Sequence, residues 1–309
     1  MAQNKKIFQK LSNSNFYIND KWEVILQIGR GSFGEVYSGR SLNNGSNVAI
    51  KLEFVESRKS LFEREIMVYE KLKDGIGIPE VYWQGQDSKI KDINIIVMQL
   101  LGPSLRDLLY FCRGKFSLKT VSSLAEQMIS RLEFIHERNV IHQDIKPDNF
   151  VMGTGSHSNT VFLIDFGLSN FYRKFHSNEH IEKETNVRMV GSLKYSSFNC
   201  QDGIKLSRRD DLESLGYTLI SFMRGTLPWS GLEAKTPEIK AQKIKEMKTK
   251  VDMLCKNLPT EIKTYIDYCK GLKFKDTPDY EFCRNLFRQI SINSKNTKYI
   301  FDWNRPTKR

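Results

Sequence analysis

Three polar side chains near the middle of the chain could carry out phosphoryl transfer. Asp144 and Asn149 lie in the stretch Val140-Ile141-His142-Gln143-Asp144-Ile145-Lys146-Pro147-Asp148-Asn149, and Asp165 opens Asp165-Phe166-Gly167. Transfer of a phosphoryl group to a hydroxyl needs one carboxylate to accept the proton. It also needs a second carboxylate and an amide to hold Mg²⁺. Each residue alone is commonplace in a loop, but the ordered set is hard to obtain by chance.

A glycine-rich stretch nearer the N-terminus could bind phosphates. Residues 29–36 have the spacing Gly-x-Gly-x-x-Gly-x-Val, and glycines let backbone amides approach an anion without an obstructing Cβ. The same pattern fits a dinucleotide-binding turn, in which Glu53 would be the ribose-binding acid. That alternative needs a helix directly after the glycines. Strand-like residues and the Asn43-Asn44-Gly45 turn follow instead, so we favour a glycine hairpin over phosphates.

Lys51 and Glu65 could complete the phosphate site as an ion pair. Lys51 closes the strand-like stretch Val48-Ala49-Ile50-Lys51, and Glu65 belongs to the helix that follows. Each of them alone would be an ordinary surface charge. Together with the glycines, the pair would hold the ammonium against the α- and β-phosphates of a nucleotide.

The elements that must position these groups follow from periodicity and turn signals. Strand patterns cover residues 22–28, 48–54, about 81–83 and 93–98, and Ser60-Leu61-Phe62-Glu63 predicts a capping box that opens a helix to Leu72. Beyond Gly102-Pro103 the pattern is helical, with apolar residues every three or four positions from Val121 to Ile135. Further helices are predicted at 210–224, 236–256, 260–270 and 279–290. The sequence therefore predicts an α+β fold, with a mobile lead-in at 1–19, an antiparallel-sheet lobe at 20–99 and a helical lobe at 100–309.

Composition limits the class of protein. The chain has 309 residues, 39% hydrophobic and 27% charged, and contains no apolar run long enough for a transmembrane helix. The N-terminus lacks an apolar signal-peptide core, and five cysteines without a Cys-x-x-Cys pair indicate a reducing compartment with inert thiols. The net charge of +12 fits nucleic acid, an anionic membrane, an acidic protein substrate or simply a solvated surface. We interpret the lysines of residues 235–250 as a solvated helix face, and find no nucleic-acid-binding motif.

Several longer phrases resemble one family of protein kinases. With the motifs above in order, the chain resembles eukaryotic protein kinases and, more narrowly, the casein kinase 1 family, over about residues 20–305. The Ala-Pro-Glu motif of most kinases is absent, and Ser197-Phe198-Asn199 stands where this family has Ser-Ile-Asn. The phrases similar to the family are Leu100-Leu101-Gly102-Pro103-Ser104-Leu105, Lys115-Phe116-Ser117-Leu118-Lys119-Thr120-Val121, Ser207-Arg208-Arg209-Asp210-Asp211-Leu212-Glu213-Ser214-Leu215-Gly216-Tyr217, Leu227-Pro228-Trp229 and Phe301-Asp302-Trp303-Asn304.

The resemblance implies a two-lobed protein kinase fold that uses ATP and Mg²⁺ to phosphorylate serine or threonine, often in acidic or pre-phosphorylated protein segments. It implies that Asp144 is the catalytic base, that Lys146 steadies the transferring phosphate, and that Asn149 and Asp165 are the metal ligands. Asp211 would brace the catalytic loop through its backbone. The implied nucleotide contacts, with Met98 as gatekeeper and Leu100 and Leu101 in the hinge, are Ile28, Gly29, Gly31, Ser32, Gly34, Val36, Ala49, Lys51, Glu65, Met98, Leu100 and Leu101.

Departures from the family concentrate on anion binding. Gln143 replaces the arginine before the catalytic aspartate, so that position offers no charge to an anion near the activation segment. Lys194 stands where the family has an anion-binding arginine, and Pro237 where it has a second anion-binding lysine. The expected substrate anion site therefore consists of Arg188, Lys194 and Lys235. Gln99 replaces a hinge glutamate, where adenine recognition uses mainly backbone groups.

Two other classes of function stay open at this point. A pseudokinase scaffold would be favoured by loss of Lys51, Asp144 or Asp165, none of which is lost. A nucleic-acid-binding protein would be retained by heparin and not by acidic peptides. The prediction is a monomeric serine/threonine kinase of the cytoplasm, with the nucleus as an alternative, that binds neither nucleic acid nor membrane.

Overall fold

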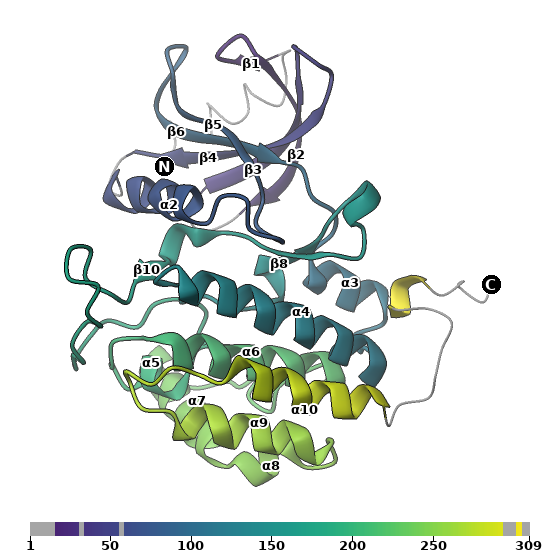
Figure 1. Cartoon of the computed structure of the whole chain (residues 1–309), viewed down its shortest axis with the longest axis vertical. Helices are drawn as coiled ribbons and strands as arrows, with labels where there is room; N and C mark the ends of the chain where they lie inside the picture. The colour runs from purple at the N-terminus through teal and green to yellow at the C-terminus, as the bar shows by residue number, and fades with distance from the viewer. Residues whose placement is uncertain (1–15, 31–33, 56–58, 293–300, 305–309) are drawn as a thin grey trace. The chain divides into compact units, whose positions relative to one another are not determined.

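The structure is a computed structural model that describes residues 16–30, 34–55, 59–292 and 301–304. These residues divide into two compact units (Figure 1). The first contains the described parts of residues 1–102 together with 153–158, and the second contains residues 103–152 with the described parts of 159–309. Gly102 and Pro103 lie at the join between them.

The first unit is built on a curled antiparallel sheet and one helix, α2 (Lys59–Lys71). The described strands form a six-stranded sheet in the order β1-β2-β3-β4-β6-β5, in which every neighbouring pair is antiparallel. The strands are β1 (Phe16–Ile18), β2 (Trp22–Arg30), β3 (Gly34–Ser41), β4 (Asn47–Phe54), β5 (Val81–Asp87) and β6 (Ile90–Gln99). β1 lies within the residues that the sequence analysis assigns to a lead-in, so the sheet begins before residue 20.

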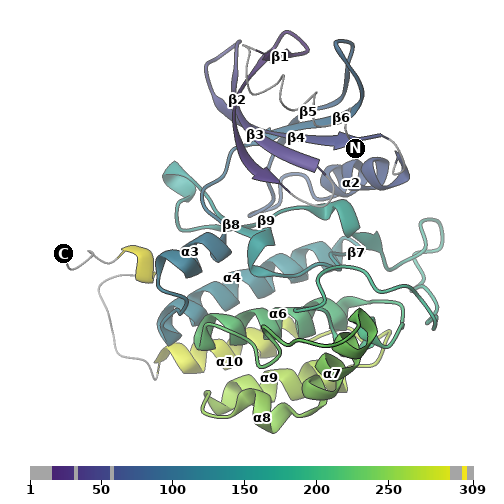
Figure 2. The ribbon, with the colours of Figure 1, turned by 180° about the vertical axis from the view of Figure 1, so that it is seen from behind.

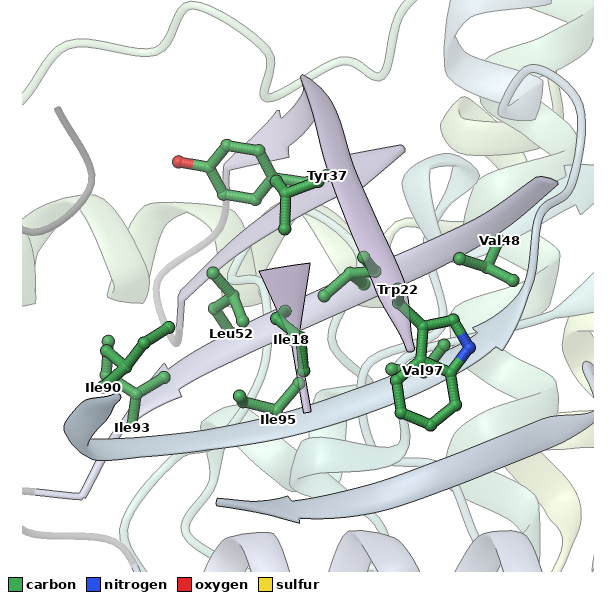
Figure 3. Close-up of a cluster of buried hydrophobic side chains, with 11 residues drawn as sticks. Ile18, Trp22, Tyr37, Val48, Leu52, Ile90, Ile93, Ile95 and Val97 are labelled. Carbon is green, nitrogen blue, oxygen red and sulfur yellow. The ribbon is translucent and has the colours of Figure 1, made fainter. Parts of the chain in front are cut away.

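One face of this sheet is packed into an apolar core. In β4, Val48, Ile50 and Leu52 alternate onto that face and are buried, as a period-two strand pattern requires. Figure 3 shows them with side chains from β1, β2, β3 and β6. In β2 the register shifts after Val24 and after Gln27, and Leu26 and Ile28 are exposed. The shifts break the alternation, which explains why the sequence pattern of this strand is imperfect.

The second unit is mainly helical (Figures 1 and 2). The helix α4 (Leu118–Glu137) buries the apolar stripe predicted from its spacing, and it packs against α6 and α10. The other helices are α3 (Leu105–Phe111), α5 (Phe198–Gln201), α6 (Arg208–Arg224), α7 (Pro237–Thr249), α8 (Val251–Cys255), α9 (Thr260–Gly271) and α10 (Tyr280–Ile292). Both views show α6 between α4 and α9.

The connection between α4 and α5 contains short strands and 3₁₀ turns. The strand β7 (Val140–Ile141) pairs with β10 (Asn170–Phe171), and β8 (Phe150–Met152) pairs with β9 (Val161–Leu163). Short 3₁₀ turns lie there at Pro147–Asn149, Gly155–His157 and Phe166–Leu168, and a further one lies after α10 at Asp302–Asn304. Because β8 and β9 pair, the stretch around Asn149 lies beside the stretch before Asp165.

Two sequence expectations about residues 235–256 are wrong. The predicted single helix at 236–256 is two helices, which meet at Lys250, where the backbone leaves the helical conformation. The lysines were interpreted as a solvated face, yet Lys248 is completely buried. Its neighbours come from distant parts of the chain, so local spacing could not reveal them. Within the described residues no helix has the length and apolar character to cross a bilayer.

Candidate active site

Lys51 and Glu65 form the ion pair that the sequence predicts. Lys51 lies in β4 and Glu65 in α2, and the lysine Nζ lies 2.7 and 2.8 Å from the two carboxylate oxygens. Both side chains are largely shielded from water, which strengthens their attraction. The Glu53 carboxylate lies 3.0 Å from the same Nζ. An ammonium held in this way keeps a defined position on the sheet.

The strands that lead into and out of the glycine-rich stretch pair antiparallel. β2 and β3 pair on either side of residues 31–33, and Gly31 and Ser32 lie outside the described residues. A Cβ at Gly34 would lie 1.9 Å from the Leu52 carbonyl oxygen, so only glycine permits this approach of β3 to β4. Because a strand and not a helix follows the glycines, the dinucleotide-binding alternative is wrong for this stretch.

The sheet face opposite the apolar core carries several predicted nucleotide contacts. Register pairs Val36 with Lys51 and Ala49 with Met98, and directly paired residues project to the same face. Ala49 and Met98 are buried, and this face offers small and apolar surface beside the Lys51 ammonium. The other predicted contacts of this unit lie at its strand ends: Ile28 and Gly29 in β2, and Leu100 and Leu101 directly after β6.

In the second unit, Asp144 is buried and held from several sides. The Lys146 Nζ donates to its Oδ2 at 2.5 Å, and the backbone N–H of Ser192 donates to its Oδ1 at 2.9 Å. The amide of Asn149 donates to the Asp144 carbonyl oxygen at 2.8 Å. Gly191 makes this packing possible, because its φ is +75° and a Cβ there would lie 2.5 Å from the Gln143 carbonyl oxygen. The carboxylate is therefore fixed in orientation, as a proton acceptor must be.

Asn149 and Asp165 are oxygen donors of the kind that Mg²⁺ prefers, and they come from paired stretches. The N–H of Ile164 donates to the Asn149 carbonyl oxygen at 3.0 Å. The Asn149 amide nitrogen faces Asp144, which leaves its amide oxygen as the donor toward a cation. Asp165 has a left-handed backbone with φ of 66°. Completed by phosphate oxygens of a nucleotide, this carboxylate–amide pair would hold Mg²⁺.

His142 connects these two stretches. Its Nε2 lies 3.0 Å from the Ile164 carbonyl oxygen, and its Nδ1 accepts from the Asp144 N–H at 3.3 Å. A carbonyl can only accept, so the proton of the neutral ring must be on Nε2. The ring therefore couples the loop of Asp144 to the residues before Asp165.

Asp211 braces the catalytic loop through its backbone, as the family resemblance implies. Its carboxylate accepts from the N–H groups of His142 and Gln143 at 2.7 and 2.9 Å. The His136 Nε2 lies 3.0 Å away, and the Tyr280 hydroxyl lies 2.7 Å from the other ring nitrogen. Burial lowers the pKa of His136, so the ring is neutral at pH 7 and donates from Nε2 to Asp211.

The three predicted anion-site residues come from separate stretches. Arg188 and Lys235 are exposed, and Lys194 is partly exposed with its Nζ 5.1 Å from the centre of the Tyr195 ring. The Trp229 Nε1 donates to the Lys194 carbonyl oxygen at 2.8 Å, which fixes the backbone at Lys194. Pro237 is the first residue of α7, a position where its missing N–H costs no hydrogen bond. Among the described residues no contact joins the three cations into one pocket.

Sequence reasoning missed three residues that shape this unit's site. Ser192 touches both Asp144 and Lys146, the latter through a 3.3 Å bond from the Lys146 Nζ to its Oγ. Glu213 is buried and accepts from the Phe198 N–H, while the Lys270 Nζ lies 3.2 Å away. Lys248 is buried and donates from its Nζ to the Ser196 carbonyl oxygen at 2.6 Å. Ser192 lies 48 residues from Asp144 in the sequence, so nothing local could have suggested its role in advance.

The comparison with protein families agrees with this geometry. The family model described as protein kinase domain matches residues 22–288, which cover most of both units. The antiparallel-sheet unit and the helical unit are the two lobes of that fold. Protein kinases use ATP and Mg²⁺ and transfer a phosphoryl group to protein substrates. Because this match covers most of the chain, the chain belongs to the protein kinase family.

Proposed function

We propose that the protein is an active serine/threonine kinase of the casein kinase 1 type, with a preference for acidic or pre-phosphorylated segments. The observation that carries the proposal is the contact of Asp144 and Lys146 with Ser192. The segment that starts at Gly191 lies directly on the proposed base. A peptide bound along such a segment offers the base a hydroxyl close to its own backbone, as in serine or threonine. The hydroxyl of tyrosine lies farther from its backbone and would extend past the base.

Each proposed catalytic residue has one chemical task. Asp144 accepts the proton of the substrate hydroxyl, and Lys146 neutralises charge on the transferring phosphoryl group. Lys51, oriented by Glu65, binds phosphate oxygens of ATP. Asn149 and Asp165 supply the protein ligands for Mg²⁺, which when bound neutralises phosphate charge. Each of these proposed catalytic residues has a side chain able to perform its task, which favours an enzyme over a pseudokinase scaffold.

The substrate preference is inferred from charge. The chain carries +12, and Arg188, Lys194 and Lys235 border the segment after Gly191 or the start of α7. A lysine cannot make the bidentate fork of arginine with a phosphate, and Pro237 carries no charge. We therefore expect several carboxylates to act together on a diffuse basic surface, with a bound phosphate giving only a limited advantage.

A kinetic comparison of matched serine peptides tests the proposal. One peptide carries phosphoserine three residues upstream, one an upstream acidic run and one neutral residues, and each has a tyrosine twin. We expect kcat/KM to be higher for both anionic peptides than for the neutral one. The kcat/KM of the phosphoserine (primed) peptide should exceed that of the acidic peptide by less than about tenfold, or roughly 1.4 kcal/mol. The preference for either anionic peptide over the neutral one should weaken as the salt concentration rises.

Other outcomes discriminate between the alternatives. Binding of MgATP without any turnover would indicate a pseudokinase, and equal use of tyrosine peptides would contradict the serine/threonine assignment. A kcat/KM for the phosphoserine peptide a hundredfold above that of the acidic peptide would show a dedicated phosphate pocket. A neutral peptide that performs as well as the others would remove the electrostatic argument.

The proposal includes a monomer in a reducing compartment, the cytoplasm with the nucleus as an alternative. The state of the thiols supports the reducing compartment. All five cysteines are present as thiols, and four of them are buried. Burial raises the pKa of Cys200 and of Cys255 to about 11, so these thiols are protonated and unreactive at neutral pH. Fractionation of cells that express a tagged chain tests the compartment.

A further inference from the structure

Lys248 is unusual among the described residues because it is the one lysine whose side chain is fully buried. It lies near the C-terminal end of α7, whereas Lys243 of the same helix is exposed and Lys240 and Lys245 are half-buried. Burying an ammonium costs several kcal/mol unless partners replace its water. The contacts of its Nζ therefore indicate what the residue does.

The lysine Nζ is enclosed by backbone carbonyls and aromatic rings. It donates to the carbonyl oxygens of Ser196 and Leu193 at 2.6 and 3.3 Å, and lies 3.5 Å from the Ser196 Oγ. The ring centres of Tyr217 and Trp229 lie 5.1 and 5.3 Å away, within cation–π range. No carboxylate of the described residues pairs with it directly. The buried charge is thus directed at the backbone of residues 193–196.

That backbone continues directly to the proposed catalytic base. The N–H groups of Tyr195 and Ser196 both donate to the Ser192 carbonyl oxygen at 2.9 Å, so residues 192–196 form one tight turn. At its first residue the turn contacts Asp144 and Lys146, and at its last it is held by Lys248. α7 packs against α5, the helix that follows this turn (Figure 1).

We propose that Lys248 is a positioning residue, which fixes the turn 192–196 and, through Ser192, sets the orientation of Asp144 and the path of the bound peptide. This inference rests on the proposed kinase function. It assigns to α7 the task of holding the substrate-binding segment with a built-in cation. No phosphate on the segment is needed for that task.

The protonation of Lys248 offers a way to separate positioning from packing. Burial lowers its pKa to about 7, while the Glu213 carboxylate of α6 opposes this shift. The other titratable neighbours are Cys200 of α5, which favours the charged form, and Lys270 of α9, which disfavours it. A charged amine binds carbonyls and rings more strongly than a neutral one, so its hold on the turn should weaken above pH 7.

The test compares Lys248→Met, which keeps the chain length without the charge, with Lys248→Gln, which keeps a hydrogen-bond donor. Lys243→Met on the same helix is the matched control. We expect kcat/KM for a serine peptide to fall at least tenfold in Lys248→Met and less in Lys248→Gln. The affinity of both Lys248 variants for MgATP should stay within twofold of wild type. Lys243→Met should match wild type in both kcat/KM and MgATP affinity. Amide hydrogen exchange of residues 192–196 should be faster in the Lys248 variants than in wild type. The ratio of kcat/KM between wild type and Lys248→Met should decrease as pH rises from 6 to 9.

Each other result overturns the proposal. A folded Lys248→Met enzyme with peptide kinetics within twofold of wild type would exclude positioning. If neither Lys248 variant folds, the lysine serves the stability of the whole unit. A wild-type chain that phosphorylates no peptide refutes the proposed function instead, and in that case the exchange of residues 192–196 still decides whether Lys248 holds the turn.

Discussion

Replacing Asp211 by asparagine should both destabilise the helical unit and slow catalysis. The Asp211 carboxylate is buried and accepts from the N–H groups of His142 and Gln143 and from His136. An asparagine of the same shape can place its one oxygen toward two of these donors. Its NH₂ group then faces the third donor, which is left without an acceptor.

The size of the effect follows from these contacts. A buried donor left unpaired costs about 1–3 kcal/mol, and hydrogen bonds to a charged acceptor are worth about 1.5–3 kcal/mol against roughly 1 kcal/mol for neutral ones. Each of the two remaining bonds loses roughly 0.5–2 kcal/mol and the unpaired donor costs about 1–3 kcal/mol, so the free energy of unfolding should fall by roughly 2–7 kcal/mol. This range includes the about 3–5 kcal/mol expected for breaking a buried ionic contact. At about 2–4 °C per kcal/mol for a unit of this size, Tm should fall by roughly 4–28 °C.

Urea unfolding followed by circular dichroism measures the free energy, and a peptide assay at a temperature where the variant is folded measures kcat. We expect kcat to fall roughly tenfold or more, because the backbone that carries Asp144 loses its anchor. The control is Asp252→Asn, an exposed carboxylate beside Lys263, which should change stability by less than about 0.5 kcal/mol. An Asp211→Asn variant that loses less than about 1 kcal/mol and keeps full turnover would refute the bracing argument.

Four further predictions concern the site and its surroundings. Asp144→Asn should lower peptide turnover by roughly 10²–10⁴-fold while a fluorescent ATP analogue still binds, and near-wild-type turnover would show that Asp144 is not the base. Asp165→Ala should in addition lose the Mg²⁺ dependence of nucleotide binding in the same titration, because a carboxylate ligand is removed. Phosphatase treatment should leave the rate unchanged, since Gln143 offers no charge to a phosphate on residues 166–199; a loss reversed by rephosphorylation would contradict this. Burial raises the pKa of Asp210 from 3.8 to about 6, so the folded state binds this proton more tightly than the unfolded state, and the contribution of Asp210 to stability should decrease as pH rises from 4 to 6. The free energies of unfolding of wild type and Asp210→Asn, measured with urea, should therefore diverge between pH 4 and 6. Parallel pH dependences would show that the pKa of Asp210 is not raised in the folded state.

Local patterns predicted most of the elements and the ordered motifs, because both depend on residues close together in sequence. The helix over Val121–Ile135 and the strand over 48–54 follow from periodicity, and the structure has both, in α4 and β4. The Lys51–Glu65 pair was predictable because strand and helix are adjacent along the chain. The two-lobed fold is confirmed by the family match.

What could not be predicted depends on distant neighbours. Lys248 has the residue type and spacing of a surface lysine, and only Tyr217, Trp229 and the turn after Ser192 make it a buried one. Ser192 has no local signal, since its contacts to Asp144 depend on the path of the whole segment. The exposure of Leu26 follows from bulges in β2, which the residue types alone do not encode.

The order in which contacts become possible differs between the two units during synthesis. In the sheet nearly every strand pairs with one made shortly before it, so this unit can begin to form as the chain emerges. In the helical unit α4 packs against α10, and Glu133 and Arg284, which join these helices, are 151 residues apart. At ~5–20 residues per second, the apolar stripe of α4 waits roughly 8–30 s for that cover. During that time the nascent chain presents a long amphipathic helix to chaperones, because part of its apolar stripe still lacks the cover of α10.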